Sequence, residues 1–193
     1  MSGSGTARRI VEAARDVLVA EGAEAVTMRR VANAVGVTAM AIYKHYPNRE
    51  AVLGAVADET LRELAGSWGR RAGGGDWETR VFALLEDFLD FALGRPHLYT
   101  FLMTDRREQA RRFPADFAGG GSPVFGHVTE AVEEGMRLGL LRADDPLEVT
   151  LTVTASTQGL VQLYLGGRIG LPEDEFRALC RRSLRRIFDG VRA

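Results

Sequence analysis

The chain of 193 residues is long enough for one ordinary domain, or for a small module joined to a larger one. With 46% hydrophobic and 26% charged residues it can bury a continuous core, which excludes a disordered chain. The net charge of −1 excludes a polycation that coats nucleic acid by bulk attraction, so DNA binding would require a local basic surface.

The single cysteine and the N-terminal segment indicate the compartment. Cys180 alone makes neither an intramolecular disulfide nor a zinc site, so we expect a reducing, cytoplasmic setting. Charged residues follow the Ser/Gly-rich residues 1–6, where a secretion signal would need an unbroken apolar core. The longest nearly apolar stretch, residues 34–43, is half of the roughly 20 residues that cross a bilayer. We therefore expect neither a secretion signal nor a membrane span.

Helical periodicity begins near the N-terminus. Apolar residues within 10–18 recur at the spacing of an amphipathic helix. Thr27 is placed to cap a short second helix, which Gly36 ends. Thr38 is placed to cap a third helix through about residue 45, before Pro47 breaks it. The first part of the chain thus predicts a small bundle of helices.

A long fourth helix is expected after these. Asn48 is placed to cap it, and its apolar stripe continues to about Arg71, a length of roughly 34 Å at ~1.5 Å per residue. The glycines at 73–75 interrupt the pattern, and Asp76 is placed to cap the next helix. We expect a second module to follow this interruption.

The second module also shows helical patterns. A fifth helix is predicted over 81–92, and Pro96 starts a short one. The arginines within 106–112 are expected on the next helix, and residues 114–122 on a mobile loop. A further helix is predicted from Ser122, as its cap, through Met136.

Residues 149–154 present the one strand candidate, because β-branched residues alternate there with period two. We interpret them as helical, since Pro146 marks a helix start, the apolar pattern continues to Leu165, and no second strand is available for pairing. A clean apolar stripe predicts a last helix over 176–191. The expected fold is all-α with about nine helices, a small N-terminal bundle and a larger C-terminal one.

Residues 26–49 carry the most informative pattern. Two short helices, with Ala32 at their crossing and Gly36 in the turn, predict a helix-turn-helix. No acidic residue occurs from 25 to 49, although the whole chain is slightly acidic. This asymmetry favours a surface that meets phosphates, with basic residues at Arg29, Arg30, Lys44 and Arg49.

Candidate DNA-binding residues lie at helix N-termini and on the second helix of the pair. Free N–H groups at helix N-termini favour phosphates, and the second helix would enter the major groove. Lys44 and His45 can donate to guanine, and Ala39 and Met40 offer methyl contacts to thymine. We expect Tyr46 to lie in the core. The candidate set is Thr27, Arg29, Thr38, Ala39, Met40, Tyr43, Lys44, His45, Asn48 and Arg49.

Residues 27–53, TMRRVANAVGVTAMAIYKHYPNREAVL, resemble the DNA-binding signature of the tetracycline-repressor (TetR) family. The most specific part is the run Tyr43, His45, Tyr46, Asn48 and Arg49, which is similar to that family's aromatic-x-His-aromatic segment, a polar pair and a basic residue. The resemblance implies that Arg49 grips phosphate at the start of the fourth helix. It covers roughly residues 7–64, and beyond residue 76 only the helical layout and length fit.

The resemblance implies a homodimeric repressor that binds a palindromic operator in double-stranded DNA and is released by a small-molecule effector. Residues 7–52 would form the DNA-binding domain, and residues 53–193 the regulatory domain for ligand binding and dimerisation. Its last two helices would pack against their copies as a four-helix bundle. The alternatives are an activator, a regulator that needs a co-ligand, or a ligand-binding dimer without DNA function.

Candidate effector-binding residues in the second module are aromatic side chains, methionines and amides. Such aromatic residues either line a pocket or pack as plain core, and both interpretations stay open. Gln158 and Gln162 are favoured, because a buried amide needs partners that a ligand or water supplies, although Gln162 can instead bond across a dimer. The set is Phe88, Phe91, Tyr99, Met103, Phe125, Met136, Gln158, Gln162 and Tyr164.

Patterns typical of enzymes are missing from the sequence. We find no Gly-rich phosphate loop after a strand, no HExxH and no GxSxG, so we expect no catalysis and assign no cofactor. His97 and His127 lack the neighbouring ligands of a metal site, and no metal is assigned. Cys180 lies on an apolar stripe and is expected to be a buried small residue.

Overall fold

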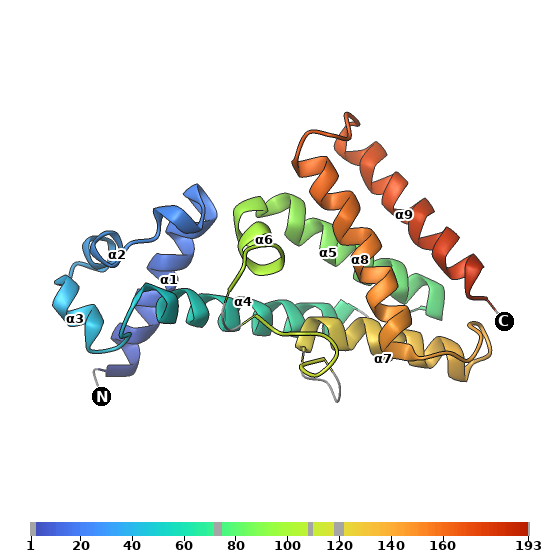
Figure 1. Ribbon diagram of the computed structural model, residues 1–193, viewed down its shortest axis with the longest axis horizontal. Coiled ribbons are helices and arrows are strands. Elements are labelled where there is room, and N and C mark those ends of the chain that lie inside the picture. The colour runs from blue at the N-terminus through green and yellow to red at the C-terminus, as the bar shows by residue number, and fades with distance from the viewer. Residues whose placement is uncertain (1–2, 72–74, 108–109, 118–121, 193) are drawn as a thin grey trace. The chain divides into compact units, whose positions relative to one another are not determined.

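The computed structural model describes residues 3–71, 75–107, 110–117 and 122–192, and it confirms the all-α fold (Figure 1). A 3-10 turn, η1 (Ala23–Ala25), follows the first helix. Within the described residues there is no β-strand, and Leu141 and Arg192 form an isolated antiparallel bridge. The α-helices of these residues are α1 (Gly3–Glu21), α2 (Met28–Val35), α3 (Ala39–Tyr43), α4 (Arg49–Arg71), α5 (Trp77–Gly94), α6 (Pro96–Met103), α7 (Pro123–Arg137), α8 (Pro146–Leu165) and α9 (Glu173–Gly190).

Local capping starts two of the later helices as the sequence predicts. Before α5, the Thr79 amide donates to Oδ1 of Asp76 over 2.8 Å. Before α8, Oδ1 of Asp145 accepts from the amides of Leu147 and Glu148 over 2.8 and 3.1 Å, and Pro146 takes the first helical position. The β-branched residues 149–154 lie inside α8, which confirms the helical interpretation of that stretch.

The expected helix over the arginines at 106–112 is wrong. In the described parts of this stretch, residues 104–107 and 110–112 are irregular, and residues 113–117 form turns. The backbone leaves the helix at Thr104, and Arg107 folds back so that Nη2 donates to the Leu102 carbonyl over 3.1 Å. Its guanidinium also lies 5.0 Å from the Phe101 ring centroid. Arg107 therefore caps α6 instead of extending a new helix.

The chain forms two compact units. Unit 1 comprises Met1–Leu61 and Arg95–Ala110, and unit 2 comprises Arg62–Gly94 and Arg111–Ala193. The boundary falls inside α4, and α6 belongs to unit 1. The division into functional domains at residues 52 and 53 concerns activity and stays a prediction.

In unit 1, α1 packs against α2, η1 and α6, and α2 packs against α3. Nη2 of Arg9 donates to the Val35 carbonyl over 2.7 Å, which ties α1 to the last turn of α2. Burying these aliphatic side chains supplies the main driving force for the bundle. Its fully buried core includes Ile10, Leu18, Val26, Val31, Ile42, Val52 and Val56.

In unit 2, α5 packs against α7, α8 and α9, and α8 lies beside both α7 and α9 (Figure 1). The Trp77 indole N–H donates to the Ala131 carbonyl over 2.7 Å, and its ring meets Phe188 edge-on with centroids 5.2 Å apart. One aromatic side chain at the start of α5 thus contacts both α7 and α9.

Candidate nucleic-acid interface

Helices α2 and α3 form the helix-turn-helix that the sequence predicts. Oγ1 of Thr27 accepts from the Arg30 amide, and Oγ1 of Thr38 accepts from the Ala41 amide, each over 3.2 Å. Gly36 ends α2 with φ of 74°, a left-handed conformation that side chains disfavour. The two caps and the glycine turn are therefore confirmed, and the inward faces are held by Val31, Ala32, Val35 and Ile42.

Helix α4 begins directly after the pair. Oδ1 of Asn48 accepts from the Ala51 amide over 2.8 Å, which confirms the predicted cap. Helix α3 is shorter than expected, since it ends at Tyr43 and Lys44 is its C-terminal cap. Two amides beyond it, those of His45 and Tyr46, donate to the Ile42 carbonyl over 2.8 and 2.9 Å.

The outer side of α3 presents apolar and basic side chains together. Met40 is 70% exposed and Tyr43 is 48% exposed, although both are large. Lys44, the only lysine of the chain, is also exposed. Met40 and Tyr43 lie three residues apart on α3, so their exposed side chains are neighbours, and together they suit a surface that a partner covers.

The remaining candidates on this bundle lie around α3. Ala39 and His45 are half-buried, and Thr27, Arg29 and Thr38 are exposed. Tyr46 is half-buried, and burial raises its pKa, with a further rise from the Glu59 carboxylate. The side chain of Tyr46 thus points more toward the core than that of Tyr43.

Not all of the basic residues predicted for the DNA-binding surface lack an acidic partner. Arg30 pairs with Glu21, the last residue of α1, and Nη1 donates to Oε2 over 2.8 Å. This hydrogen bond lowers the pKa of Glu21 and raises that of Arg30. Among the described residues, neither Arg29 nor Lys44 has an acidic partner within ion-pair distance. The basic character of the surface therefore rests on those two side chains.

Arg49 is engaged by the protein itself. Nε donates to the Val26 carbonyl over 2.7 Å, and Nη2 donates to the Ala23 carbonyl over 2.6 Å. The third nitrogen, Nη1, lies 3.6 Å from Oε1 of Glu50. Sequence reasoning missed these contacts, and those of Arg9 and Glu21, because they join residues that only the tertiary fold brings together.

The candidate effector-binding residues divide between the two units. Tyr99 and Met103 lie in α6 of unit 1; Tyr99 is fully buried, and burial raises its pKa to about 12. The other seven candidates lie in unit 2, so the structure does not gather the whole set in either unit. Their role in ligand binding stays a prediction.

Several of these candidates have ring partners within unit 2. Phe88 meets Trp68 edge-on with centroids 6.4 Å apart, and Tyr164 stacks on Phe176 with centroids 4.0 Å apart. Phe125 meets Phe117 edge-on at 4.7 Å. Such pairs support the packing interpretation of these aromatic residues. Phe91 is buried, Met136 and Gln158 are half-buried, and Gln162 is exposed on α8.

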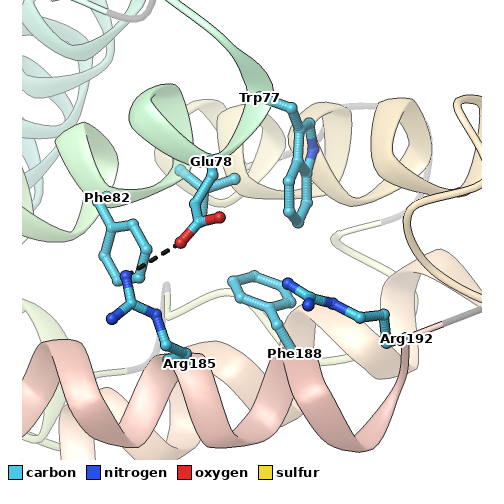
Figure 2. A pocket seen from close by; sticks show the side chains of 7 residues that line it. Trp77, Glu78, Phe82, Arg185, Phe188 and Arg192 are labelled. Atoms are coloured by element: carbon cyan, nitrogen blue, oxygen red, sulfur yellow. Dashed lines mark hydrogen bonds and ion pairs between the residues drawn. The ribbon is translucent and has the colours of Figure 1, made fainter.

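A small pocket of unit 2 lies where α5 faces α9, and none of the predicted residues line it (Figure 2). Trp77, Phe82 and Phe188 form its apolar walls, and Arg185 donates to Glu78 at its edge over 3.0 Å. Its volume of about 10 Å³ admits roughly one water molecule, so it is a packing gap and not an effector site.

The described part of the chain holds neither a metal-binding cluster nor a membrane-spanning helix. Its His, Cys, Asp and Glu side chains form no group of three or more that would hold a metal ion. None of its helices combines the length and the apolar character that a membrane crossing requires.

Family models match both parts of the chain. Residues 10–56 match the model described as bacterial regulatory proteins, tetR family, and residues 81–187 match the tetracyclin repressor-like C-terminal domain. The chain belongs to the TetR family. It is therefore a transcriptional regulator of the helix-turn-helix class, as the sequence motif predicts.

A known transcriptional repressor is similar to part of the chain. The HTH-type transcriptional repressor DrrR1 of Streptomyces coeruleorubidus is 31% identical over 102 residues, which are 53% of this chain and 36% of DrrR1. The matched stretch thus spans about a third of that relative's length.

Solved structures show the same fold. A protein of unknown function from Rhodococcus sp. RHA1 superposes with a TM-score of 0.79 at 22% identity, covering 97% of this chain and 96% of that one. The regulator FadR of Bacillus subtilis, in complex with stearoyl-CoA, superposes with a TM-score of 0.76 at 14% identity, covering 95% and 98%. At these identities the likeness concerns the fold alone.

Proposed function

We propose that this TetR-family chain is a cytoplasmic repressor that binds a palindromic operator as a homodimer and is released by a small-molecule effector. The observation that carries the DNA-binding part is the outer side of α3, where Met40, Tyr43 and Lys44 are exposed together. Lys44 can donate a hydrogen bond to guanine or to a phosphate, and Met40 can contact a thymine methyl group. Arg29 and the caps of α2 and α4 would face the flanking phosphates.

Homodimerisation is proposed through the free side of α8. Two of its leucines, Leu151 and Leu163, are 38% and 41% exposed although they belong to a helix of the C-terminal unit. Ala155 and Gly159, also exposed, lie at the same helical spacing and permit close helix approach. A second copy would cover this side of α8, with α9 completing a four-helix bundle.

A two-fold symmetric dimer is proposed because a single copy of α3 would have low affinity for DNA. A single short helix in one major groove binds DNA weakly, and two linked copies add the binding energies of their half-sites.

Release by an effector requires that the effector bind the DNA-free form of the protein more tightly than the DNA-bound form. Reversing a 99:1 ratio of the two forms needs about 5.5 kcal/mol of differential affinity. Helix α4 has residues in both units, and we propose it as the lever between ligand and DNA.

The sole lysine makes the DNA contact directly testable. Acetylation of Lys44, followed by mass spectrometry, should be strongly slowed by a duplex that the protein has selected, because that duplex covers the side chain. Lys44→Ala should reduce the slope of log K against log salt by about one per protomer if Lys44 serves phosphate. If it reads guanine, about 1–3 kcal/mol of discrimination should vanish at one base pair.

Arg142→Ala is the matched control, since Arg142 is an exposed basic residue between α7 and α8, outside both the helix-turn-helix and the helices of the proposed dimer. It should leave both the affinity and the salt slope unchanged. Equal acetylation of Lys44 with and without the duplex, together with wild-type binding by Lys44→Ala, would refute the role of α3.

A further inference from the structure

The geometry of Arg49 suggests a role that the family resemblance does not supply. The side chain starts at the first residue of α4 and reaches back to two carbonyls that precede α2. The Ala23 carbonyl belongs to η1, and the Val26 carbonyl lies next to Thr27, the cap of α2. Arg49 thus joins the residues just before the helix-turn-helix to the residue just after it.

Two of the three guanidinium nitrogens of Arg49 donate to these carbonyls. Hydrogen bonds of 2.7 Å from Nε and 2.6 Å from Nη2 have the length of charge-assisted bonds, and the side chain is only 30% exposed. The third nitrogen faces a carboxylate oxygen of Glu50 at 3.6 Å. A phosphate approaching that nitrogen would meet this negative charge.

The two accepting carbonyls lie in a connection that packs on α1 and α6 but has little backbone hydrogen bonding of its own. Residues 23–25 form a single 3-10 turn, in which the Val26 amide donates to the Ala23 carbonyl over 3.1 Å. Short 3-10 turns have poor hydrogen-bond geometry and are easily distorted. A planar guanidinium that binds two carbonyls at once fixes both the position and the angle of this connection.

We propose that Arg49 is a positioning residue, which holds α2 and α3 in the orientation that DNA requires without itself binding phosphate. This inference rests on the proposed DNA-binding function. Because the connection before α2 and the start of α4 are clamped together, the exposed side chains of α3 are presented in one arrangement. Without the clamp, that arrangement would be only one of several, and DNA would have to select it.

The test combines charge-retaining and charge-removing variants. Arg49→Lys keeps the positive charge, but a single ammonium group does not span both carbonyls in the guanidinium geometry. Arg49→Met keeps the apolar stem and removes the charge. Both variants should lower affinity for a wild-type-selected duplex by roughly tenfold or more, the effect of one lost charge-assisted bond, and both should keep the wild-type salt slope. Lys44→Ala, which removes a proposed contact, serves as the comparison.

A second measurement does not involve DNA. Hydrogen exchange at the amides of Ala25 and Val26 should accelerate in Arg49→Lys and in Arg49→Met, and should stay at the wild-type rate in Lys44→Ala. Circular dichroism establishes that each variant is folded, and Arg49→Lys decides the matter alone if Arg49→Met does not fold.

The outcomes separate this inference from the proposed function. Wild-type affinity in Arg49→Lys, with a salt slope reduced by about one per protomer in Arg49→Met, would show a phosphate contact and overturn the positioning role. Unchanged exchange at Ala25 and Val26 in both variants would also overturn it. If the wild-type protein binds no duplex specifically, while exchange accelerates as expected, the clamp stands and the proposed function fails.

Discussion

At the scale of single residues, Gly135 shows how one contact constrains a position. A Cβ on this residue of α7 would lie 2.8 Å from Cζ2 of Trp77 and 3.0 Å from Cδ1 of Leu141. The indole cannot retreat freely, because its N–H donates to the Ala131 carbonyl one turn earlier in α7. Glycine is therefore required here by the close approach of α5, although it is a poor helix former.

Gly135→Ala should destabilise the protein by about 1–3 kcal/mol, since overpacking the indole outweighs the gain in helix propensity. Gly126→Ala on the same helix is the control, because nothing lies within 4 Å of the added methyl group. It should stabilise the protein by up to about 1 kcal/mol. Denaturant unfolding measures both changes, and stabilisation by Gly135→Ala would show that the indole moves at little cost.

Cys180 is buried, and burial raises its pKa from 9.0 to about 11. The folded state therefore favours the protonated thiol, so this residue's contribution to stability is full below pH 9 and is lost as the pH rises toward 11. At pH 8, a thiol reagent should label Cys180 slowly in the native protein and rapidly in denaturant. Mass spectrometry measures the labelling rate. Equal rates in the native and the denatured protein would contradict the burial of this thiol.

At the scale of elements, charged residues set the register of α5 against α9. Nη1 of Arg177 contacts Asp90 at 2.8 Å and Glu86 at 3.1 Å. Arg181 donates to Glu86 over 2.7 Å, and one turn further along Arg185 reaches Glu78 (Figure 2). Arginines four residues apart on α9 thus meet acids on one side of α5.

Arg177→Met should lower the free energy of unfolding by about 1 kcal/mol. Arg177 contacts several carboxylates, and such a network contributes more than one isolated exposed ion pair. The effect should shrink in ~1 M salt, where the screening length is ~3 Å. Arg182→Met, at an exposed position one residue beyond Arg181, should change stability by no more than about 0.5 kcal/mol. Equal effects of the two substitutions would remove the case for a register-setting network.

Sequence reasoning succeeded where the determinants are local. Thr27, Thr38, Asn48 and Asp145 each bind amides two or three residues ahead, so a short window of sequence contains both partners. The helix-turn-helix was predictable for that reason. The arginines at 106–112 were misassigned because Arg107 caps α6, a contact that depends on how the chain turns after Thr104.

At the scale of the whole molecule, contacts between residues far apart in the sequence could not be predicted from the sequence. The bonds from Arg49 to carbonyls 23 and 26 residues earlier carry no signal in a local pattern. The placement of α6 with the N-terminal unit follows from its packing on α1 and η1, which periodicity does not report. The effector candidates were chosen from residue type and spacing, and neither property distinguishes core from pocket.

The proposed dimer can be tested with two substitutions. Leu163→Glu places a charge on the free side of α8 and should convert a homodimer into a monomer, measured by sedimentation. Leu138→Glu changes a leucine that is 51% exposed at the end of α7 and should leave the dimer intact. A dimeric Leu163→Glu variant would place the interface elsewhere.

Operator binding is tested by selecting bound duplexes from a random DNA pool with the purified protein at moderate salt and sequencing them. We expect enrichment of an inverted repeat whose half-sites lie about one helical turn apart, since two copies of α3 would contact adjacent major grooves. A folded, dimeric protein that enriches no sequence, alone or with candidate effectors, would contradict operator binding by this chain.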